Sequence, residues 1–184
     1  MIITAGDLKG KSIICPAGKD IRPTSSKIRQ AIFNILYSMG IELSGAKLLE
    51  LFSGTGIVSL EAISRGVSGA MLVDNSINSV NVSQKNIKTL GLEKKVTIIK
   101  QDAIEFVENR EIKSFDLVYI DPPYRYQEYI KLLQALTLKI NDKAILMAES
   151  NKVLIEENNE IGIEIIKIKS WGETFVTFMR KRNG

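Results

Sequence analysis

The chain has 184 residues, of which 45% are hydrophobic and 25% charged. This composition indicates one soluble globular domain and excludes disordered and fibrous proteins. One cysteine and no histidine exclude an intrachain disulfide and histidine-based triads and disfavour zinc, so we expect no metal site. No apolar run reaches the roughly 18 residues of a membrane span, and the first residues lack a secretory signal. We therefore expect a cytoplasmic protein with no membrane partner.

The net charge of +4 is unevenly distributed along the chain. Residues 1–47 carry 7 basic and 3 acidic side chains, residues 48–164 carry 13 and 17, and residues 165–184 carry 5 and 1. Two cationic margins around an acidic middle suit a polyanionic partner such as nucleic acid. An unevenly charged, solvated surface explains the charge alone equally well.

The first 46 residues predict an extension made of a hairpin and a helix. Apolar runs at 2–4 and 12–15 flank a turn that contains two glycines. Thr24 or Ser25 can cap a helix that ends near Tyr37, in which Ile28 and Ile32 begin a single apolar stripe. Lys27 and Arg29 lie off that stripe. We expect residues 1–46 to form an extension that faces RNA.

From residue 47 onward, apolar strands alternate with helices. Strands are predicted at 47–51, 70–73, 96–99, 115–120 and 144–148, and helices at 57–64, 76–90, 103–108 and 127–138. This alternation is typical of an α/β fold with a parallel sheet covered on both faces. Two further strands, at 161–168 and 174–180, are separated by a short link and predict an antiparallel edge. Residues 47–184 therefore form the predicted catalytic domain.

A glycine-rich turn follows the first of these strands. In the segment Phe52-Ser53-Gly54-Thr55-Gly56, the glycines allow close approach of a ligand, and the start of the next helix favours polar groups. A dinucleotide fingerprint needs a third glycine where this chain has Ser59. The turn therefore predicts a ligand site but argues against a pyrophosphate.

Acidic residues end the next two strands. Asp74, twenty residues after Gly54, can accept hydrogen bonds from a ribose diol, or it can cap the helix that begins near Ser76. Asp102 can accept from an adenine amino group or cap the short helix that follows it. Both roles stay open for each residue.

The most specific motif is Asp121-Pro122-Pro123-Tyr124, directly after a strand. Two prolines fix a rigid turn at the carboxyl end of the sheet, where ligands of such folds bind. The Asp121 carboxylate and the Pro122 carbonyl can accept from an exocyclic amino group of a nucleobase, on which Tyr124 can stack. A plain Pro-Pro turn is the structural alternative.

These motifs resemble those of the class I S-adenosylmethionine-dependent methyltransferases, and most closely the bacterial RsmD family, which methylates N2 of a guanine in 16S ribosomal RNA. The resemblance includes the segments at 5–11, 21–24, 29–36 and 60–66. It implies a Rossmann-like fold with S-adenosylmethionine as cofactor. It implies cofactor contacts from Glu50, Phe52, Gly54, Gly56, Asp74, Asp102 and Ala103, with Asp74 at the ribose and Asp102 at the adenine. It also implies that Asp121, Pro122, Pro123 and Tyr124 hold the target base.

The basic margins supply the predicted RNA contacts. These are Lys9, Lys11, Arg22, Thr24, Lys27, Arg29, Arg180, Lys181 and Arg182. The chain departs from the family in three places, with Glu50 where aspartate is more frequent and lysines at 9 and 11 where arginine is common. Lysine lacks the bidentate phosphate geometry of arginine.

The expected substrate is 16S ribosomal RNA, free or within a small subunit that is finished or still assembling. We expect the protein to act as a monomer. An adenine-N6 methyltransferase shares the Asp-Pro-Pro-Tyr turn, but the 60 residues after Tyr124 leave no room for a separate recognition domain. A protein-glutamine methyltransferase fits the chemistry but not the basic ends. A non-catalytic RNA-binding assembly factor predicts eroded catalytic residues, which this chain does not have.

Overall fold

The computed structural model describes residues 1–15, 24–123, 125–151, 153 and 161–182. Its strands are β1 Lys47–Leu51, β2 Gly69–Asp74, β3 Val96–Lys100, β4 Leu117–Ile120, β5 Ile145–Ser150, β6 Ile163–Trp171 and β7 Thr174–Lys181. Its helices are α1 Ser26–Ser38, α2 Ile57–Ser64, α3 Ile77–Thr89, α4 Ala103–Asn109 and α5 Tyr129–Lys139. Every strand and helix predicted from residue 47 onward is confirmed, with boundaries that differ by at most three residues.

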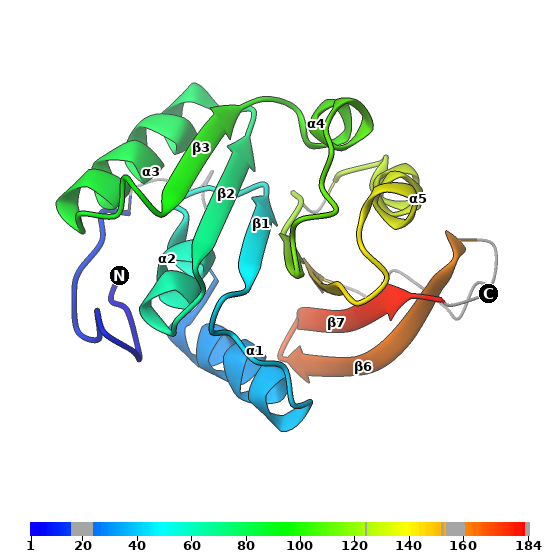
Figure 1. Cartoon of the computed structure of the whole chain (residues 1–184), viewed down its shortest axis with the longest axis horizontal. Coiled ribbons are helices and arrows are strands. Elements are labelled where there is room, and N and C mark those ends of the chain that lie inside the picture. Colours follow the sequence, from blue (N-terminus) through cyan, green and yellow to red (C-terminus); the bar gives the residue numbers. More distant parts are fainter. Residues whose placement is uncertain (16–23, 124, 152, 154–160, 183–184) are drawn as a thin grey trace.

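The strands form one seven-stranded sheet in the order β3-β2-β1-β4-β5-β7-β6 (Figure 1). Strands β1 to β5 are parallel, and β7 runs antiparallel between β5 and the outermost strand β6. This topology confirms the predicted α/β fold with an antiparallel edge. The carboxyl ends of β1 to β4 lie on the same side of the sheet. The strand order reverses between β1 and β4, which is the position at which such folds bind ligands.

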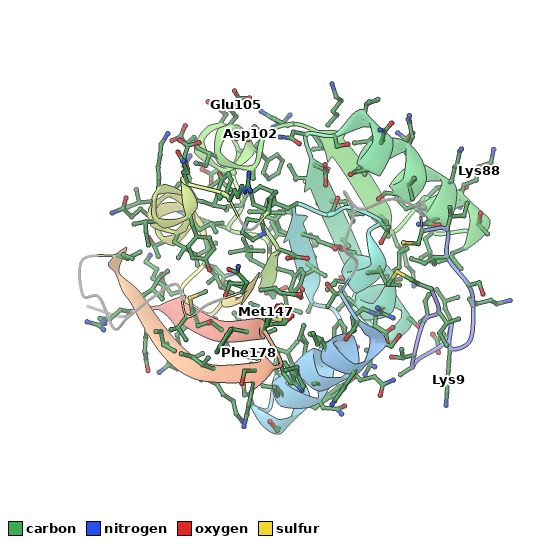
Figure 2. The ribbon with its side chains drawn as sticks, turned by 180° about the vertical axis from the view of Figure 1, so that it is seen from behind. Lys9, Lys88, Asp102, Glu105, Met147 and Phe178 are labelled. Carbon is green, nitrogen blue, oxygen red and sulfur yellow. The ribbon has the colours of Figure 1, made fainter. Side chains whose placement is uncertain are left out.

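Two apolar cores cover the two faces of the sheet. One contains Leu48 and Leu72 together with residues from α1, α2 and α3, and the other contains Leu49 and Val73 together with residues from α4 and α5. Neighbouring residues of β1 therefore point to opposite faces, as the period of a strand requires. Figure 2 shows Met147 of β5 beside Phe178 of β7, its partner in the register, in the first core.

The N-terminal hairpin is reduced to a single antiparallel bridge between Ile2 and Ser12. Backbone hydrogen bonds also join Ile3 to Lys11 and Ile13 to Met1, and side chains of distant helices take up further backbone groups. The Thr4 N–H donates to Glu61 of α2 (2.8 Å), and the Ile14 N–H donates to Asn86 of α3 (2.7 Å). The predicted hairpin is confirmed as an antiparallel pair, but its runs at 2–4 and 12–15 do not form regular strands, because part of its backbone bonds to helices.

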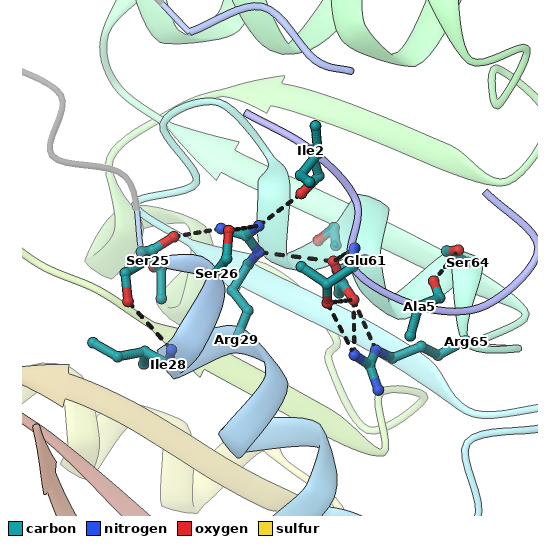
Figure 3. A network of polar contacts seen from close by, with 12 residues as sticks. Ile2, Ala5, Ser25, Ser26, Ile28, Arg29, Glu61, Ser64 and Arg65 are labelled. Atoms are coloured by element: carbon teal, nitrogen blue, oxygen red, sulfur yellow. Dashed lines mark hydrogen bonds and ion pairs between the residues drawn. The ribbon is translucent and has the colours of Figure 1, made fainter. Parts of the chain in front are cut away.

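A buried ionic network joins the extension to α2 (Figure 3). Arg29 of α1 is fully buried, lies 3.8 Å from the Glu61 carboxylate, and donates to the carbonyl oxygens of Thr24 and Ile2. Burial lowers the pKa of Arg29, and the charge of Glu61 opposes that shift. Arg65 completes the network at 2.9 Å from Glu61. The predicted contact between Arg29 and phosphate is therefore wrong, because its guanidinium is enclosed by protein.

Candidate active site

Backbone hydrogen bonds bring the turns at the carboxyl edge of the sheet together. The Ser53 N–H donates to Val73 at the end of β2 (3.1 Å), and the Gln101 N–H donates to Asp74 (3.1 Å). On the other side of β1, the Asp121 N–H donates to Leu51 (3.4 Å). The glycine turn, the two acidic strand ends and the Asp-Pro-Pro turn therefore form one row, as the motifs predict.

Three residues of the glycine turn have left-handed backbone conformations. Phe52, Gly54 and Gly56 have φ angles of 59°, 53° and 75°. A Cβ atom on Gly56 would lie 2.5 Å from Leu72 Cδ2. Only glycine fits at this position, where the backbone passes close to β2 and begins α2.

The carboxylate of Asp74 connects the glycine turn to the start of α3. Its Oδ2 accepts from the Gly54 N–H (2.8 Å) and its Oδ1 from the Ser76 N–H (2.9 Å). The side chain of Ser76, not that of Asp74, caps α3. Since a carboxylate has about four acceptor positions, Asp74 can bind both peptide groups and still receive hydroxyl donors from a ribose.

Asp102 caps α4. Its Oδ1 accepts from the N–H groups of Ile104 and Glu105, at 2.9 and 3.2 Å. The capping alternative is confirmed for this residue, and Figure 2 shows Asp102 and Glu105 together at the start of that helix. The adenine contact of Asp102 and Ala103 stays a prediction.

We expect the Asp74→Ala substitution to weaken binding of S-adenosylmethionine at least tenfold. Hydrogen bonds to a charged group contribute about 1.5–3 kcal/mol each, and the glycine turn also loses its tie to β2. Calorimetric titration measures the Kd, and Asp74→Asn, which keeps one oxygen, should lose less affinity. An unchanged Kd for Asp74→Ala would show that the carboxylate only organises the turn.

Glu50 is a buried carboxylate at the centre of the sheet, 2% exposed. Its Oε2 accepts from the Ser59 N–H in the first turn of α2 (2.8 Å). Burial raises the pKa of Glu50 to about 7, with a smaller contribution from the charge of Asp74, while the hydrogen bonds from Ser59 act in the opposite direction. Glu50 therefore fixes α2 behind the glycine turn and changes protonation near neutral pH.

The stability of the protein should fall as pH rises from about 5 to 8 because of Glu50. The pKa of this group is higher in the folded chain than in the unfolded one, so the folded state binds the extra proton and loses this advantage as the pH passes 7. Relative to Glu50→Gln, the free energy of unfolding of the wild type should drop by about 2 to 3 kcal/mol over this range. Urea titrations at each pH measure the difference, and parallel curves would contradict the shift.

The Asp-Pro-Pro turn forms the other half of the site. Pro122 is buried and Pro123 is exposed, and the Tyr126 N–H closes the turn by donating to the Pro123 carbonyl (2.8 Å). Tyr124 lies outside the described residues. We define Asp121, Pro122 and Pro123 as the acceptor turn, because they offer a carboxylate and proline carbonyls beside the glycine turn.

Two tyrosines that the motifs do not include belong to this region. The ring of Tyr126 packs edge-to-face on Phe52 at 4.9 Å, which connects the acceptor turn with the glycine turn. Burial and the charges of Asp102 and Glu128 raise the pKa of Tyr126 to about 12. Tyr119 of β4 is buried and bonded to Thr24 and Glu149. The tyrosines that follow Asp121 in the sequence could have indicated that Tyr126 belongs to the site. No local pattern distinguishes Tyr119 from an ordinary core residue.

The predicted RNA contacts differ in their exposure. Lys27 is exposed in the first turn of α1, whereas Thr24 is 4% exposed and its hydroxyl bonds to Tyr119. Thr24 is therefore corrected to an internal contact. Arg22 lies outside the described residues.

The basic C-terminal residues lie near the amino ends of the parallel strands, whereas the acceptor turn lies at their carboxyl ends. Arg180 pairs in register with Ile145, the first residue of β5, because β7 runs antiparallel. A strand of this length spans about 17–20 Å. Arg180 also bonds to Glu164 (2.8 Å) and Lys181 to Asp142 (2.8 Å). Their role as RNA contacts, with that of Arg182, stays a prediction, and the structure places Arg180 far from the acceptor turn.

The basic turn of the N-terminal hairpin also lies near the amino ends of the parallel strands. The Leu8 N–H, next to Lys9, donates to Ser64 Oγ at the last residue of α2 (2.9 Å), and this helix runs away from the glycine turn. Lys9 and Lys11 are exposed. Their predicted contact with RNA phosphates stays a prediction.

A solved structure and two sequence relatives match this chain over nearly its whole length. The Escherichia coli protein yhhF superposes with a TM-score of 0.84 at 23% identity, covering 99% of this chain and 98% of its own. Bacillus subtilis YlbH is 30% identical over 192 residues, which cover 99% of this chain and 100% of that protein. Ribosomal RNA small subunit methyltransferase D of Buchnera aphidicola subsp. Acyrthosiphon pisum is 31% identical over 175 residues, covering 92% of this chain and 83% of that protein.

The protein is thus an S-adenosylmethionine-dependent methyltransferase of class I. Residues 1–180 match the model of the family described as "Conserved hypothetical protein 95", and the chain belongs to this family, the RsmD family. The predicted membership and the predicted cofactor are both confirmed. Among the described residues, no cluster of three or more potential ligands could hold a metal ion, and no helix in those same ranges is long and apolar enough to cross a membrane.

Proposed function

We propose that the protein transfers the methyl group of S-adenosylmethionine to the exocyclic N2 amino group of a guanine in 16S ribosomal RNA. The observation that supports this most strongly is the hydrogen bond from the Asp121 N–H to Leu51, which holds the acceptor turn beside the glycine turn. The name of the Buchnera relative supports the ribosomal substrate. We further propose that the protein acts as a cytoplasmic monomer on free 16S RNA or on a small subunit.

The residues of the site fit the cofactor. The turn leaves no space for a side chain at Gly56, and the carboxylate of Asp74 has the chemistry for ribose hydroxyls. The buried hydroxyl of Tyr126 has no hydrogen-bond partner among the described residues, and its ring lies on Phe52. When bound, S-adenosylmethionine supplies a methyl group on a sulfonium centre, which nucleophiles attack.

The acceptor turn supplies what a poor nucleophile needs. The lone pair of an exocyclic amino group is delocalised into the ring, so the nitrogen must be oriented before it reacts. Asp121 and the Pro122 carbonyl accept its two N–H groups and direct the lone pair toward the glycine turn. As the new N–C bond forms, the nitrogen becomes positive, and the carboxylate of Asp121 stabilises this charge and receives the proton. Stacking by Tyr124 on the base completes the proposed site.

Three exposed cations form the proposed RNA surface around the acceptor turn. Lys27 lies in the first turn of α1, three residues after Thr24, and Arg125 follows Tyr124. Lys169 of β6 pairs with Val176, which pairs with Glu149 of β5. Two strand spacings, about 10 Å, therefore separate Lys169 from the β5 strand next to the acceptor turn.

Replacing Lys27, Arg125 and Lys169 together with alanine should weaken binding of 16S RNA and make it less sensitive to salt. Each lost phosphate contact reduces the slope of log affinity against log salt by almost one unit. Filter binding between about 50 and 200 mM salt measures the slope. The matched control replaces Arg180, Lys181 and Arg182, which lie at the far edge of the sheet. A larger effect of the control would place the RNA on that far edge.

Incubation with methyl-labelled cofactor tests the substrate. Unmodified 16S RNA, unmodified small subunits and 23S RNA are offered in parallel, and primer extension then locates the modified nucleotide. We expect label at a single position in 16S RNA, free or within the subunit. Label only in 23S RNA would contradict the proposal.

A further inference from the structure

Glu149 is a half-buried carboxylate one strand away from the acceptor turn. The register pairs Ile120 of β4 with Ala148 of β5, so Asp121 and Glu149 follow at the same level of the sheet. Tyr119 and Met147, two residues earlier on each strand, both belong to the first core. Because side chains alternate along a strand, Asp121 and Glu149 lie on the same face as these two residues.

A hollow at the end of β5 connects Glu149 with the acceptor turn. It is lined by Pro122 and Pro123 from the turn, by Tyr126 and Tyr129, and by Glu149 with its two following residues. The hollow is therefore walled by aromatic rings and prolines, with the carboxylate of Glu149 as its charged group. The hollow, about 20 Å³, is too small to enclose a base, so a base would lie across its mouth, where rings, prolines and the Glu149 carboxylate meet.

A chain of hydroxyl groups holds the Glu149 side chain in place. The Tyr119 hydroxyl donates to Glu149 Oε2 at 2.5 Å. Thr24 Oγ1 lies 3.2 Å from the same hydroxyl, and since the tyrosine proton is already used, the threonine is the donor. Burial and the charges of Glu149 and Asp121 raise the pKa of Tyr119 well above its usual range, so this hydroxyl stays protonated. The carboxylate is thus preorganised by a buried core residue.

We propose that Glu149 is a specificity-determining residue, which accepts the N1–H of the target guanine while the acceptor turn holds the N2 amino group. This inference rests on the proposed function. In guanine, the N1–H and the N2 amino group are adjacent donors on one edge of the ring. Two carboxylates on neighbouring strands match this pair of donors. A carboxylate has about four acceptor positions, so Glu149 can accept from Tyr119 and from a base together with its other contacts.

The same carboxylate would reject adenine. Adenine carries an unprotonated N1 beside its amino group, and that lone pair would face the negative charge of Glu149. Sites built to bind a particular donor discriminate strongly against analogues without it, because a buried polar group is then left unpaired. Glu149 would explain how a turn suited to amino groups in general selects guanine.

The base 2,6-diaminopurine keeps the 2-amino group but has no hydrogen on N1. Because it also carries an amino group in place of O6, the change of its relative rate in Glu149→Gln, not the wild-type ratio alone, reports on the N1 contact. Small-subunit RNA is prepared by ligation with either guanine or diaminopurine at the position that primer extension identifies. The values of kcat/KM are compared for the wild type, Glu149→Gln and Glu164→Gln. The last variant is a matched control on β6, where Glu164 pairs with the exposed Arg180, far from the acceptor turn.

The wild type should methylate guanine at least about a hundredfold more efficiently than diaminopurine. Glu149→Gln should reduce this ratio at least tenfold, because glutamine can both donate to an unprotonated N1 and accept from N1–H. Glu164→Gln should keep the wild-type ratio. Equal use of both bases by the wild type, or an unchanged ratio in Glu149→Gln, overturns the inference. Failure of the wild type to methylate either RNA rejects the proposed function itself.

Discussion

Asp121→Ala should reduce kcat by about a hundredfold to a thousandfold while S-adenosylmethionine binds almost as well as in the wild type. Removing one preorganised group at a site of developing charge has an effect of this size, and misalignment of the attacking nitrogen adds to it. The backbone N–H of residue 121 still bonds to Leu51 in the variant, so the turn should keep its place. Single-turnover kinetics measure the rate, and calorimetry measures the Kd.

Asp121→Asn is the matched control for shape. The asparagine keeps one acceptor oxygen but loses the negative charge, so its rate should lie between those of wild type and alanine. A kcat within tenfold of wild type for Asp121→Ala would show that the amino group is held elsewhere. A large loss of cofactor affinity would instead assign Asp121 to the cofactor site.

Glu61→Gln should destabilise the protein by about 3–5 kcal/mol, the usual result of removing one partner from a buried ionic network. Glu61 is fully buried and accepts from the Thr4 N–H, the Thr4 hydroxyl and Arg65. Without its charge, the buried guanidinium groups of Arg29 and Arg65 lose their counter-ion. The extension should loosen first, because Thr4 is held through this carboxylate.

Urea unfolding measures the loss of stability, and hydrogen exchange at residues 2–14 measures the loosening. Glu164→Gln breaks the exposed pair with Arg180 and should change stability little, since surface ion pairs contribute little. Unchanged stability in Glu61→Gln would mean that the extension is held mainly by its apolar contacts through Ile3 and Ile13.

The sheet was predictable because its strands are short apolar runs between turn residues. Strands β1, β4 and β5 are buried on both faces, so local sequence alone marks them. The N-terminal hairpin was not predictable in the same way. Beyond its own pairing, its backbone bonds to the side chains of Glu61 and Asn86, which stand 57 and 72 residues further along the chain than Thr4 and Ile14. Nothing near residues 2–14 indicates those partners.

The cofactor side of the site was predictable because turns at the carboxyl ends of parallel strands must meet. The RNA contacts were only partly predictable, since a basic residue does not reveal its surroundings. Arg29 lies off the apolar stripe of α1 and looks exposed, yet α2 covers it with Glu61. The basic C-terminus follows a strand that runs antiparallel, which carries Arg180 to the far edge. Glu149 carries no motif, and its importance comes only from the register of β4 with β5.

The chemical identity of the methylated nucleoside tests the central claim most directly. Small subunits that lack the modification are incubated with the protein and with methyl-labelled S-adenosylmethionine, and the RNA is digested to nucleosides for mass spectrometry. The account predicts that the label appears as N2-methylguanosine and that Asp121→Ala removes it. Label in N6-methyladenosine would contradict the assignment of guanine, although the acceptor turn would still bind an amino group.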